Sequence, residues 1–344
     1  MRGLAKLAHG NHDLELLDLP LRQPEANEVV IRVTYAGICG TDLHIALDEF
    51  PSWPPVILGH EFTGRVEKIG EMADPRLIGT RVVCEPHAGA CHTCYLCRRG
   101  LAELCASKRS PGWGIDGAFA PYVVLPTWLI HQVPDEVPDI VAVLTEPMAV
   151  AVTALRRAHL AAGDSVLVIG AGPVGLLAAM AARASGASDV VVAGRSRGGR
   201  LEQASRLGLA VTITDDSVEF LRARTDGRGA DLVVETTGSS AGVRAALQAV
   251  RQRGRVAAIG LSGEPAISVP WDLATTRAVD LAFSMSSNYE AWGPALTILA
   301  RVAPEARALP SIYRLTDWHD AFEAVAARKV VKAVLDPSEA EASA

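Results

Sequence analysis

The chain has 344 residues, of which 49% are apolar and 21% charged, a composition typical of globular domains. Its formal net charge of −6 at pH 7 gives no indication of nucleic acid or an anionic membrane as a partner. The N-terminus lacks the apolar core of a signal peptide. One long uncharged segment, 165–182, combines glycines with a strand-then-helix pattern that argues against a membrane span. We therefore expect a cytoplasmic protein of one or, more often, two domains.

Short β segments broken by Gly and Pro make up the chain as far as about residue 150. They favour a small, loop-rich, mostly β domain, which we assign to residues 1–150. Its expected strands include 28–35, 62–69, 81–85 and 118–124.

Strands alternate with helices from about residue 164 onward. Short apolar strands joined by helices predict βαβ units and a doubly wound parallel sheet, so the fold class is α/β with a Rossmann domain. The expected strands are 165–169, 189–193, 211–214, 232–236 and 255–259, and the expected helices include 176–185, 201–207 and 241–251. We assign this domain to residues 151–287. Residues 288–344, with helices 291–301 and 317–328 and a strand 330–335, are expected to return to the first domain.

Four of the six cysteines lie within one short loop, 91–105. Their spacing is Cys91-x2-Cys94-x2-Cys97-x7-Cys105, and the two-residue gaps let the loop wrap a single ion with short turns. Four thiolates suit a tetrahedral Zn²⁺ with no open position, which is a structural site. Because no secretory signal points to an oxidising compartment, we favour this interpretation over a redox or disulfide role.

A glycine-rich turn follows the apolar strand 165–169 and opens the next helix. Its glycines permit a tight turn and a close approach of the backbone to a pyrophosphate, and the helix N-terminus offers free N–H groups to the phosphates. Within a run of βαβ units the turn predicts a dinucleotide site formed by Gly170, Gly172, Pro173, Val174 and Gly175.

The end of the second strand of this domain predicts which dinucleotide binds. An acidic residue there normally accepts the ribose 2′-OH of NAD. Here the strand runs into Gly194, Arg195, Ser196 and Arg200, without a carboxylate. The arginines and the serine are suited to a 2′-phosphate, which a carboxylate would repel. We therefore expect NADP(H), with NAD(H) as the alternative if the loop is only a solvated basic surface.

Several motifs in a fixed order carry a family resemblance. They are residues 37–44 (Gly-Ile-Cys-Gly-Thr-Asp-Leu-His), 59–62 (Gly-His-Glu-Phe), the four-cysteine loop, 116–120 (Asp-Gly-Ala-Phe-Ala), 146–147 (Glu-Pro) and the glycine-rich turn. The chain resembles the zinc-containing medium-chain dehydrogenases, in particular their polyol, sorbitol and threonine dehydrogenase branch. The resemblance implies that the first domain is a GroES-like catalytic domain and that the protein is a homodimer or homotetramer. Ala118 and Pro121 depart from the family pattern, which leaves the substrate open.

The resemblance also implies a catalytic Zn²⁺ held by Cys39 and His60, with a carboxylate from Glu61, Glu146 or both. Thiolate, imidazole and carboxylate form a ligand set that leaves a fourth position for water or substrate. Glu146 lies in an apolar run, where a buried charge needs a partner or a metal. The sequence leaves open which glutamate binds directly. Thr41 is expected to pass on the substrate proton and His44 to carry it outward, unless His44 is a plain surface residue.

The predicted function is therefore that of a zinc-dependent oxidoreductase with one catalytic and one structural zinc per chain. It would transfer a hydride between NADP(H) or NAD(H) and a small secondary alcohol, such as a polyol, sugar or amino alcohol, or the corresponding carbonyl compound. Two alternatives are a zinc-free enone or quinone reductase on the same fold and a non-catalytic dinucleotide-binding protein. The presence of Cys39, His60 and Glu146 argues against both. Trp113 is the first candidate for a substrate-pocket residue.

Overall fold

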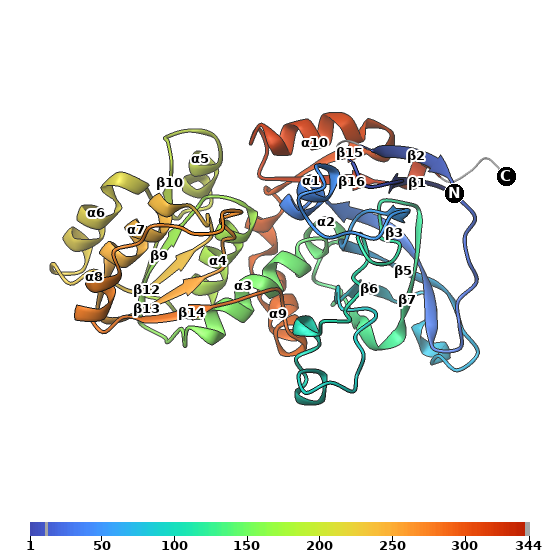
Figure 1. The fold of residues 1–344 in the computed structure, drawn as a ribbon, viewed down its shortest axis with the longest axis horizontal. Helices are drawn as coiled ribbons and strands as arrows, with labels where there is room; N and C mark the ends of the chain where they lie inside the picture. Colours follow the sequence, from blue (N-terminus) through green and yellow to red (C-terminus); the bar gives the residue numbers. More distant parts are fainter. Residues whose placement is uncertain (11–12, 341–344) are drawn as a thin grey trace. The chain divides into compact units, whose positions relative to one another are not determined.

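The computed structural model describes residues 1–10 and 13–340. The chain divides into two compact units, one formed by Met1–Glu146 with Ala306–Ala344 and the other by Pro147–Glu305 (Figure 1). The first unit therefore resumes at Ala306, whereas the sequence pattern placed this return at residue 288. Helix α9 (Tyr289–Ala306) accounts for the difference, because its Glu290 pairs at 2.8 Å with Arg156 of α3 (Thr145–Arg157) within the second unit.

The first unit is built on a seven-stranded sheet with the path β15-β16-β3-β5-β6-β8, to which β7 adds by pairing with β3. All pairs are antiparallel except β15 with β16. Alternate residues of the long strand β3, Val29, Ile31 and Val33, lie in one hydrophobic core, as the two-residue period of a strand requires. The strands are β3 (Glu28–Gly37), β5 (Glu61–Ile69), β6 (Arg81–Cys84), β7 (Tyr122–Pro126), β8 (Ile130–Gln132), β15 (Pro310–Arg314) and β16 (Lys332–Asp336).

The predicted strand 118–124 was partly wrong, because β7 begins only at Tyr122. Pro121 precedes it and has no N–H to donate to a ladder. The residues before Pro121 instead bond to the chain around Gly59, with Ala118 N donating to Gly59 O at 2.9 Å and Phe119 N to Leu58 O at 2.9 Å. This pairing fixes the loop that leads into His60.

A smaller sheet, three α-helices and several short 3-10 helices complete the described part of the first unit. The sheet has the order β2-β1-β4 and consists of β1 (Arg2–Lys6), β2 (Leu14–Asp18) and β4 (Val56–Ile57). The helices are α1 (Gly40–Ala46), α2 (Asp139–Ala142) and α10 (Trp318–Ala326). Phe322 of α10 meets Phe119 edge to face, with ring centroids 6.3 Å apart, so the C-terminal segment contributes to the core of this unit.

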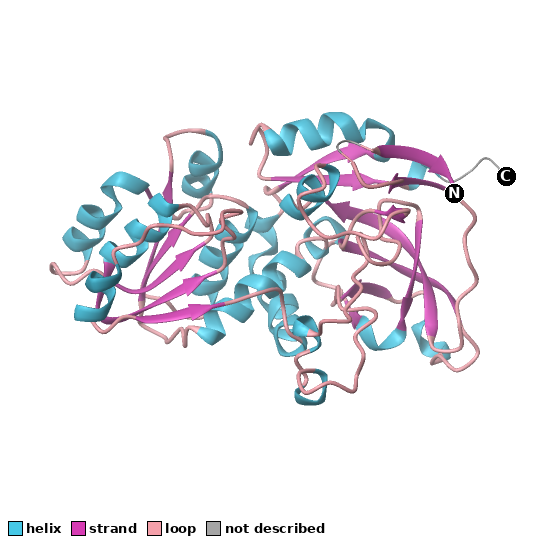
Figure 2. Cartoon of the chain, viewed as in Figure 1, coloured by secondary structure: helices cyan, strands magenta, loops and turns pink. Residues whose placement is uncertain are grey.

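The second unit confirms the predicted doubly wound sheet, with six parallel strands in the order β11-β10-β9-β12-β13-β14. Figure 2 shows helices on both faces of this sheet. The strands are β9 (Ser165–Ile169), β10 (Asp189–Gly194), β11 (Ala210–Ile213), β12 (Ala230–Glu235), β13 (Val250–Ala258) and β14 (Asp280–Phe283). Besides α3 and α9, its α-helices are α4 (Pro173–Ala184), α5 (Gly199–Arg206), α6 (Ser217–Arg224), α7 (Ser240–Ala249) and α8 (Trp271–Thr276). No helix formed by the described residues is long and apolar enough to cross a membrane.

Candidate metal and dinucleotide sites

Cys39, His60 and Glu61 meet where two neighbouring strands end and begin. Strand β3 ends at Gly37, which pairs directly with Glu61, the first residue of β5. Cys39 follows β3 as the N-cap of α1, and His60 immediately precedes β5. One ligand atom from each of the three side chains lies within 4.8 Å of the other two, and both His60 and Glu61 are buried. The structure therefore brings the thiol of Cys39 together with the imidazole and carboxylate of the adjacent residues His60 and Glu61.

Asp42 orients both Cys39 and His60. Its Oδ2 accepts a hydrogen bond from the backbone N–H of Cys39 at 2.8 Å, and its Oδ1 lies 3.6 Å from Nδ1 of His60. Burial of His60 opposes its positive charge, but Asp42 and Cys39 together raise the pKa of His60 well above its ordinary value. Such a concentration of negative groups around a buried imidazole is what a cation site requires.

Lys332 lies against Glu61 as its buried counter-ion. The Lys332 ammonium forms an ion pair with Oε2 of Glu61, and both side chains are only 2% exposed. Although burial opposes the charge, Glu61 raises the pKa of Lys332 above its ordinary value. Gly37 makes room for the pair, because a Cβ at that position would lie 2.7 Å from both Glu61 Oε2 and Lys332 Cε.

Glu146 lies in the first turn of α3 but outside the set of three close ligand atoms. Burial, and then the nearby charge of Glu61, raise the pKa of Glu146 to about 7. His60, Lys332 and Lys108 act in the opposite direction. Of the two glutamates that the sequence left open, Glu61 is the one whose carboxylate lies in ligand distance of Cys39 and His60.

The two residues expected to carry the proton occupy different environments on α1. Thr41 is half-buried, with its Oγ1 3.6 Å from Sγ of Cys39. His44 is one turn further along, 60% exposed, and its Nδ1 lies 2.8 Å from Oε2 of Glu49. Thr41 is thus adjacent to the candidate metal ligands, whereas His44 faces solvent.

Trp113, singled out from the sequence, packs against the candidate metal site. Its ring meets His60 edge to face, with centroids 5.0 Å apart, and meets Phe50 in the same way at 5.7 Å. The carbonyl of Trp113 accepts a hydrogen bond from the backbone of Trp53 at 2.7 Å, which fixes the loop that carries it. The rings of Phe50 and Trp113 therefore form an aromatic cluster with the imidazole of His60.

The four loop cysteines have the geometry of a metal centre rather than of disulfides. Sγ of Cys91 lies 3.7 Å from that of Cys105 and 4.0 Å from that of Cys97. A disulfide requires about 2.05 Å, whereas four sulfurs placed about 2.3 Å from one tetrahedral Zn²⁺ lie about 3.8 Å apart. The N–H of Cys94 also donates to Sγ of Cys91 at 3.3 Å, as expected around a thiolate. A hydrogen bond from the Thr93 hydroxyl, followed by backbone N–H bonds, lowers the pKa of Cys91 to about 5.

The glycine-rich turn between β9 and α4 has the conformation that a dinucleotide site needs. Gly170 has φ of +111°, and a Cβ there would lie 2.3 Å from Oγ1 of Thr236. A Cβ on Gly175 would lie 1.9 Å from the carbonyl oxygen of Gly170, so the first turn of α4 packs directly on the loop. A Cβ on Gly172, the N-cap of α4, would meet no atom within 4 Å. Gly172 therefore borders the open space into which a phosphate can fit, beside the helix N-terminus that starts at Pro173.

The basic loop after β10 lies at the same carboxyl edge of the sheet. Gly194 ends β10 and packs against Leu201, to whose Cδ1 an added Cβ would approach 3.2 Å. Arg195 and Ser196 are exposed, and Arg200 is half-buried in the first turn of α5. Since Val192 of β10 pairs with Val168 of β9, this loop and the glycine-rich turn emerge from adjacent strands.

Two site residues escaped the sequence analysis. Asp42 lies inside the motif 37–44 and Lys332 inside the predicted strand 330–335, but neither was predicted as a site residue. A lysine inside the apolar run 330–335 was a usable signal, because a fully buried lysine needs a partner. The partner itself, Glu61, is 271 positions away, which no local pattern reveals.

Comparison with known proteins agrees with this geometry. Residues 25–135 match the family described as alcohol dehydrogenase GroES-like domain, and residues 173–301 match that described as zinc-binding dehydrogenase. The sorbitol dehydrogenase of Halalkalibacterium halodurans is 31% identical over 98% of this chain and 99% of its own length. The chain belongs to the zinc-binding dehydrogenase family. The L-threonine 3-dehydrogenase of Saccharopolyspora erythraea is 34% identical over 98% of this chain and 99% of its own.

Solved structures place the same family on the same fold. The alcohol dehydrogenase TADH from Thermus sp. ATN1 superposes with a TM-score of 0.88 at 30% identity, covering 98% of this chain and 99% of that one. As a zinc-binding dehydrogenase of the polyol and threonine dehydrogenase branch, the protein is an NAD(P)-dependent oxidoreductase acting on alcohols. The predicted family, fold class and reaction class are therefore confirmed.

Proposed function

We propose that this zinc-binding dehydrogenase oxidises the secondary alcohol of a small polyol, sugar or amino alcohol at a zinc held by Cys39, His60 and Glu61. The observation that carries the proposal is the buried meeting of three ligand atoms within 4.8 Å of one another. The buried imidazole of His60 is also surrounded by the negative groups of Asp42 and Cys39, an arrangement that suits a cation site. The names of the sorbitol and threonine dehydrogenase relatives support the substrate class.

A zinc bound to this ligand set supplies Lewis acidity toward the substrate oxygen. The chain's own residues hold the metal ligands in position. Asp42 fixes Cys39 and His60, and Lys332 holds the carboxylate of Glu61 in place. Glu146 lies close enough to feel the charge of Glu61 but is proposed to stay outside the ligand set.

The proton of the substrate hydroxyl is proposed to leave through Thr41. Its Oγ1 is next to Sγ of Cys39, so the hydroxyl is positioned beside the site of reaction. His44 is exposed on the next turn of α1 and is proposed to exchange that proton with solvent. An imidazole is suited to this role because it takes up and releases protons near neutral pH.

The dinucleotide is proposed to be NADP(H), with Gly170, Gly172, Pro173, Val174 and Gly175 holding the pyrophosphate. Arg195 and Ser196 are exposed at the end of β10 and carry the donors that a 2′-phosphate needs, with Arg200 following on α5. The absence of an acidic side chain at this position favours NADP(H) over NAD(H).

A second, structural zinc is proposed at Cys91, Cys94, Cys97 and Cys105, which gives two ions per chain. The sulfur separations of 3.7 and 4.0 Å support it. Cysteines that serve as zinc thiolates rather than disulfides fit the reducing cytoplasm, where we propose that the protein is located.

We further propose a homo-oligomer formed through the edge strand β14. This strand ends the six-stranded sheet, and Leu281 and Phe283 on it are 40% and 69% exposed. An edge strand that carries large exposed apolar side chains favours pairing with a second copy.

The experiment that tests the catalytic proposal compares Glu61→Gln with Glu146→Gln in the zinc-loaded enzyme. Both substitutions remove one carboxylate charge from the same buried region. With sorbitol, 2,3-butanediol and L-threonine offered with NADP⁺, we expect Glu61→Gln to lose one zinc and nearly all activity, and Glu146→Gln to keep both zinc ions. Retention of two zinc ions by Glu61→Gln would overturn the ligand assignment.

A further inference from the structure

A cavity of about 430 Å³ opens at the end of the six-stranded sheet opposite the glycine-rich turn. It lies at the amino ends of β12 and β13, whereas the turn at Gly170 follows the carboxyl end of β9. Its size falls within the range of about 300–1,000 Å³ that small-molecule sites occupy. The lining residues are Arg222, Gly227, Arg228, Gln248, Val250, Arg251, Gln252 and Arg277.

The lining is strongly basic. Four of the eight residues are arginines, and none is an aspartate or glutamate. Among the described residues, Arg251 alone of the four forms an ion pair, between its Nε and Oδ1 of Asp231 at 2.6 Å. Asp231 therefore neutralises one of the four guanidinium charges. The other three repel one another around the cavity, an arrangement that a bound anion would relieve.

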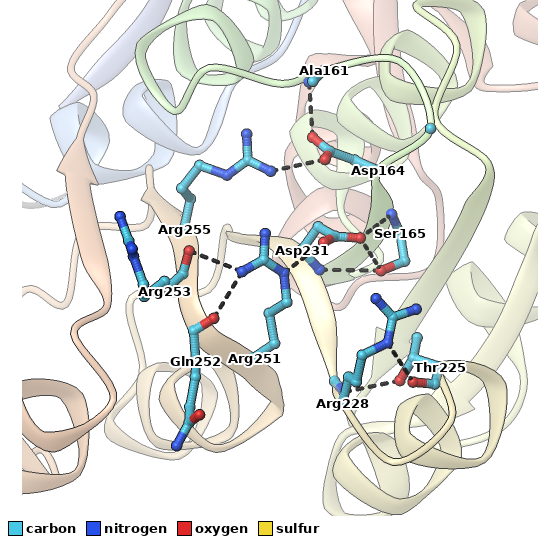
Figure 3. A network of polar contacts seen from close by, with 12 residues as sticks. Ala161, Asp164, Ser165, Thr225, Arg228, Asp231, Arg251, Gln252, Arg253 and Arg255 are labelled. Carbon is cyan, nitrogen blue, oxygen red and sulfur yellow. Dashed lines mark hydrogen bonds and ion pairs between the residues drawn. The ribbon is translucent and has the colours of Figure 1, made fainter.

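Backbone contacts hold three of the guanidinium groups in place, and Figure 3 shows those of Arg251 and Arg228. Arg251 Nη1 donates to the carbonyl of Gln252 at 2.7 Å, and Arg277 Nη1 donates to that of Gln248 at 3.1 Å. Arg228 Nε donates to the carbonyl of Thr225 at 3.2 Å. Because a guanidinium has five N–H donors in a rigid fork, these anchors leave donors on each arginine for a ligand.

The turn that carries Arg228 is itself fixed. Gly227 and Gly229 adopt φ of +79° and +95°, and the N–H of Gly229 donates to Oγ1 of the buried Thr225 at 2.9 Å. A Cβ on Gly229 would lie 2.4 Å from the carbonyl oxygen of Ala249. The turn is therefore locked against the end of α7, so Arg228 starts from a rigid backbone.

We propose that this cavity binds a small polyanion with two or more phosphate groups. Planar guanidinium forks bind phosphate oxygens in pairs, and several arginines converging on one cavity match a ligand with several such groups. A concave pocket of this volume favours a small molecule over an acidic protein surface. The site is separate from the proposed pyrophosphate contacts of the dinucleotide, because the whole length of β12 (Ala230–Glu235) lies between Gly229, before its first residue, and Thr236, which follows its last residue and contacts Gly170.

Calorimetric titration of the zinc-loaded enzyme with inorganic tripolyphosphate tests the proposal. Saturating NADPH is present throughout, so that the glycine-rich turn is already occupied. The decisive variant is Arg222→Gln combined with Arg228→Gln, since both side chains are exposed and neither forms an ion pair with any residue that the structure describes. The control, Arg301→Gln with Arg307→Gln, removes the same charge from exposed positions that do not line the cavity.

We expect wild type and control to bind alike and the cavity variant to bind roughly tenfold more weakly for each arginine removed. Arg228→Gln alone provides an intermediate case and a second check should the double variant unfold. A parallel titration with ATP identifies what the site recognises. Equal affinity for ATP and tripolyphosphate indicates recognition of the phosphates alone, and tighter binding of ATP indicates recognition of a nucleotide; both results support the site. Absence of tripolyphosphate binding by wild type, or equal binding by the cavity variant, would overturn the proposal. An equal loss in the control would also overturn it, because net charge alone would then explain the binding.

Discussion

Replacing Lys332 by methionine tests how the candidate metal site is held when no metal is bound. The substitution keeps much of the volume of the side chain but removes its charge. It leaves the carboxylate of Glu61, 2% exposed, without its ion-pair partner and close to Cys39 and Glu146. Breaking a buried ion pair by removing one partner costs about 3–5 kcal/mol, because the remaining charge is uncompensated. With about 2–4 °C per kcal/mol for domains of this size, the unfolding midpoint should fall by roughly 6–20 °C.

The chain supplies a matched control three residues earlier. Lys329 pairs with Glu323 at 2.9 Å, but the two side chains are 64% and 70% exposed. An exposed pair contributes at most about 1 kcal/mol, so Lys329→Met should lower the midpoint only slightly. Thermal unfolding of both variants, each with chelator and with zinc, is the assay. Zinc should reduce the Lys332→Met loss, since a cation at Glu61 replaces part of the missing charge. If Lys332→Met were no less stable than Lys329→Met, the buried pair would not be what holds Glu61.

We predict three further outcomes, one each for Glu146, the four-cysteine loop and the basic loop after β10. The pKa of Glu146 is raised to about 7 in the fold, so the native zinc-free protein binds more protons than the unfolded chain from about pH 4.3 to 7. The free energy of unfolding should therefore fall as pH rises through this window. Denaturant titrations of Glu146→Gln over the same pH range should lack that decrease. Cys94→Ser should lose one zinc per chain and lower the unfolding midpoint, whereas Cys84→Ser, at a buried thiol outside the loop, should keep both ions by metal analysis. Arg195→Asp should shift the ratio of kcat/KM for NADP⁺ over NAD⁺ toward NAD⁺ by roughly tenfold or more, as expected for a lost charge-assisted contact, while Arg197→Asp gives the effect of charge alone.

The parts of the fold that the sequence predicted are those with a strong local period. Strand β9 was predicted at its exact bounds, and β10 to within one residue, because continuous apolar runs bounded by turn residues mark buried parallel strands. Helix α6 and strand β14 were not predicted. The strand has only four residues, all exposed or half-buried, so it lacks the apolar run that identifies its neighbours.

The candidate site likewise has parts that local sequence predicts and parts that depend on contacts between distant segments. The cysteine loop and the glycine-rich turn are contiguous, so their geometry was predictable from spacing. The choice between Glu61 and Glu146 was not, because it depends on the register of β3 with β5, where Gly37 faces Glu61. The role of Lys332 depends likewise on the pairing of β16 with β3, which brings the C-terminal segment back to the site.

Zinc content measured together with activity in Cys39→Ser tests the central claim most directly. Cys39 is the N-cap of α1 and lies outside the four-cysteine loop, so its loss should leave the structural ion in place. We predict two zinc ions per wild-type chain, one in the variant, loss of alcohol oxidation, and unchanged binding of NADPH. Two zinc ions in an active Cys39→Ser enzyme, or one zinc ion in an active wild type, would contradict the assignment of Cys39, His60 and Glu61 as the catalytic metal site.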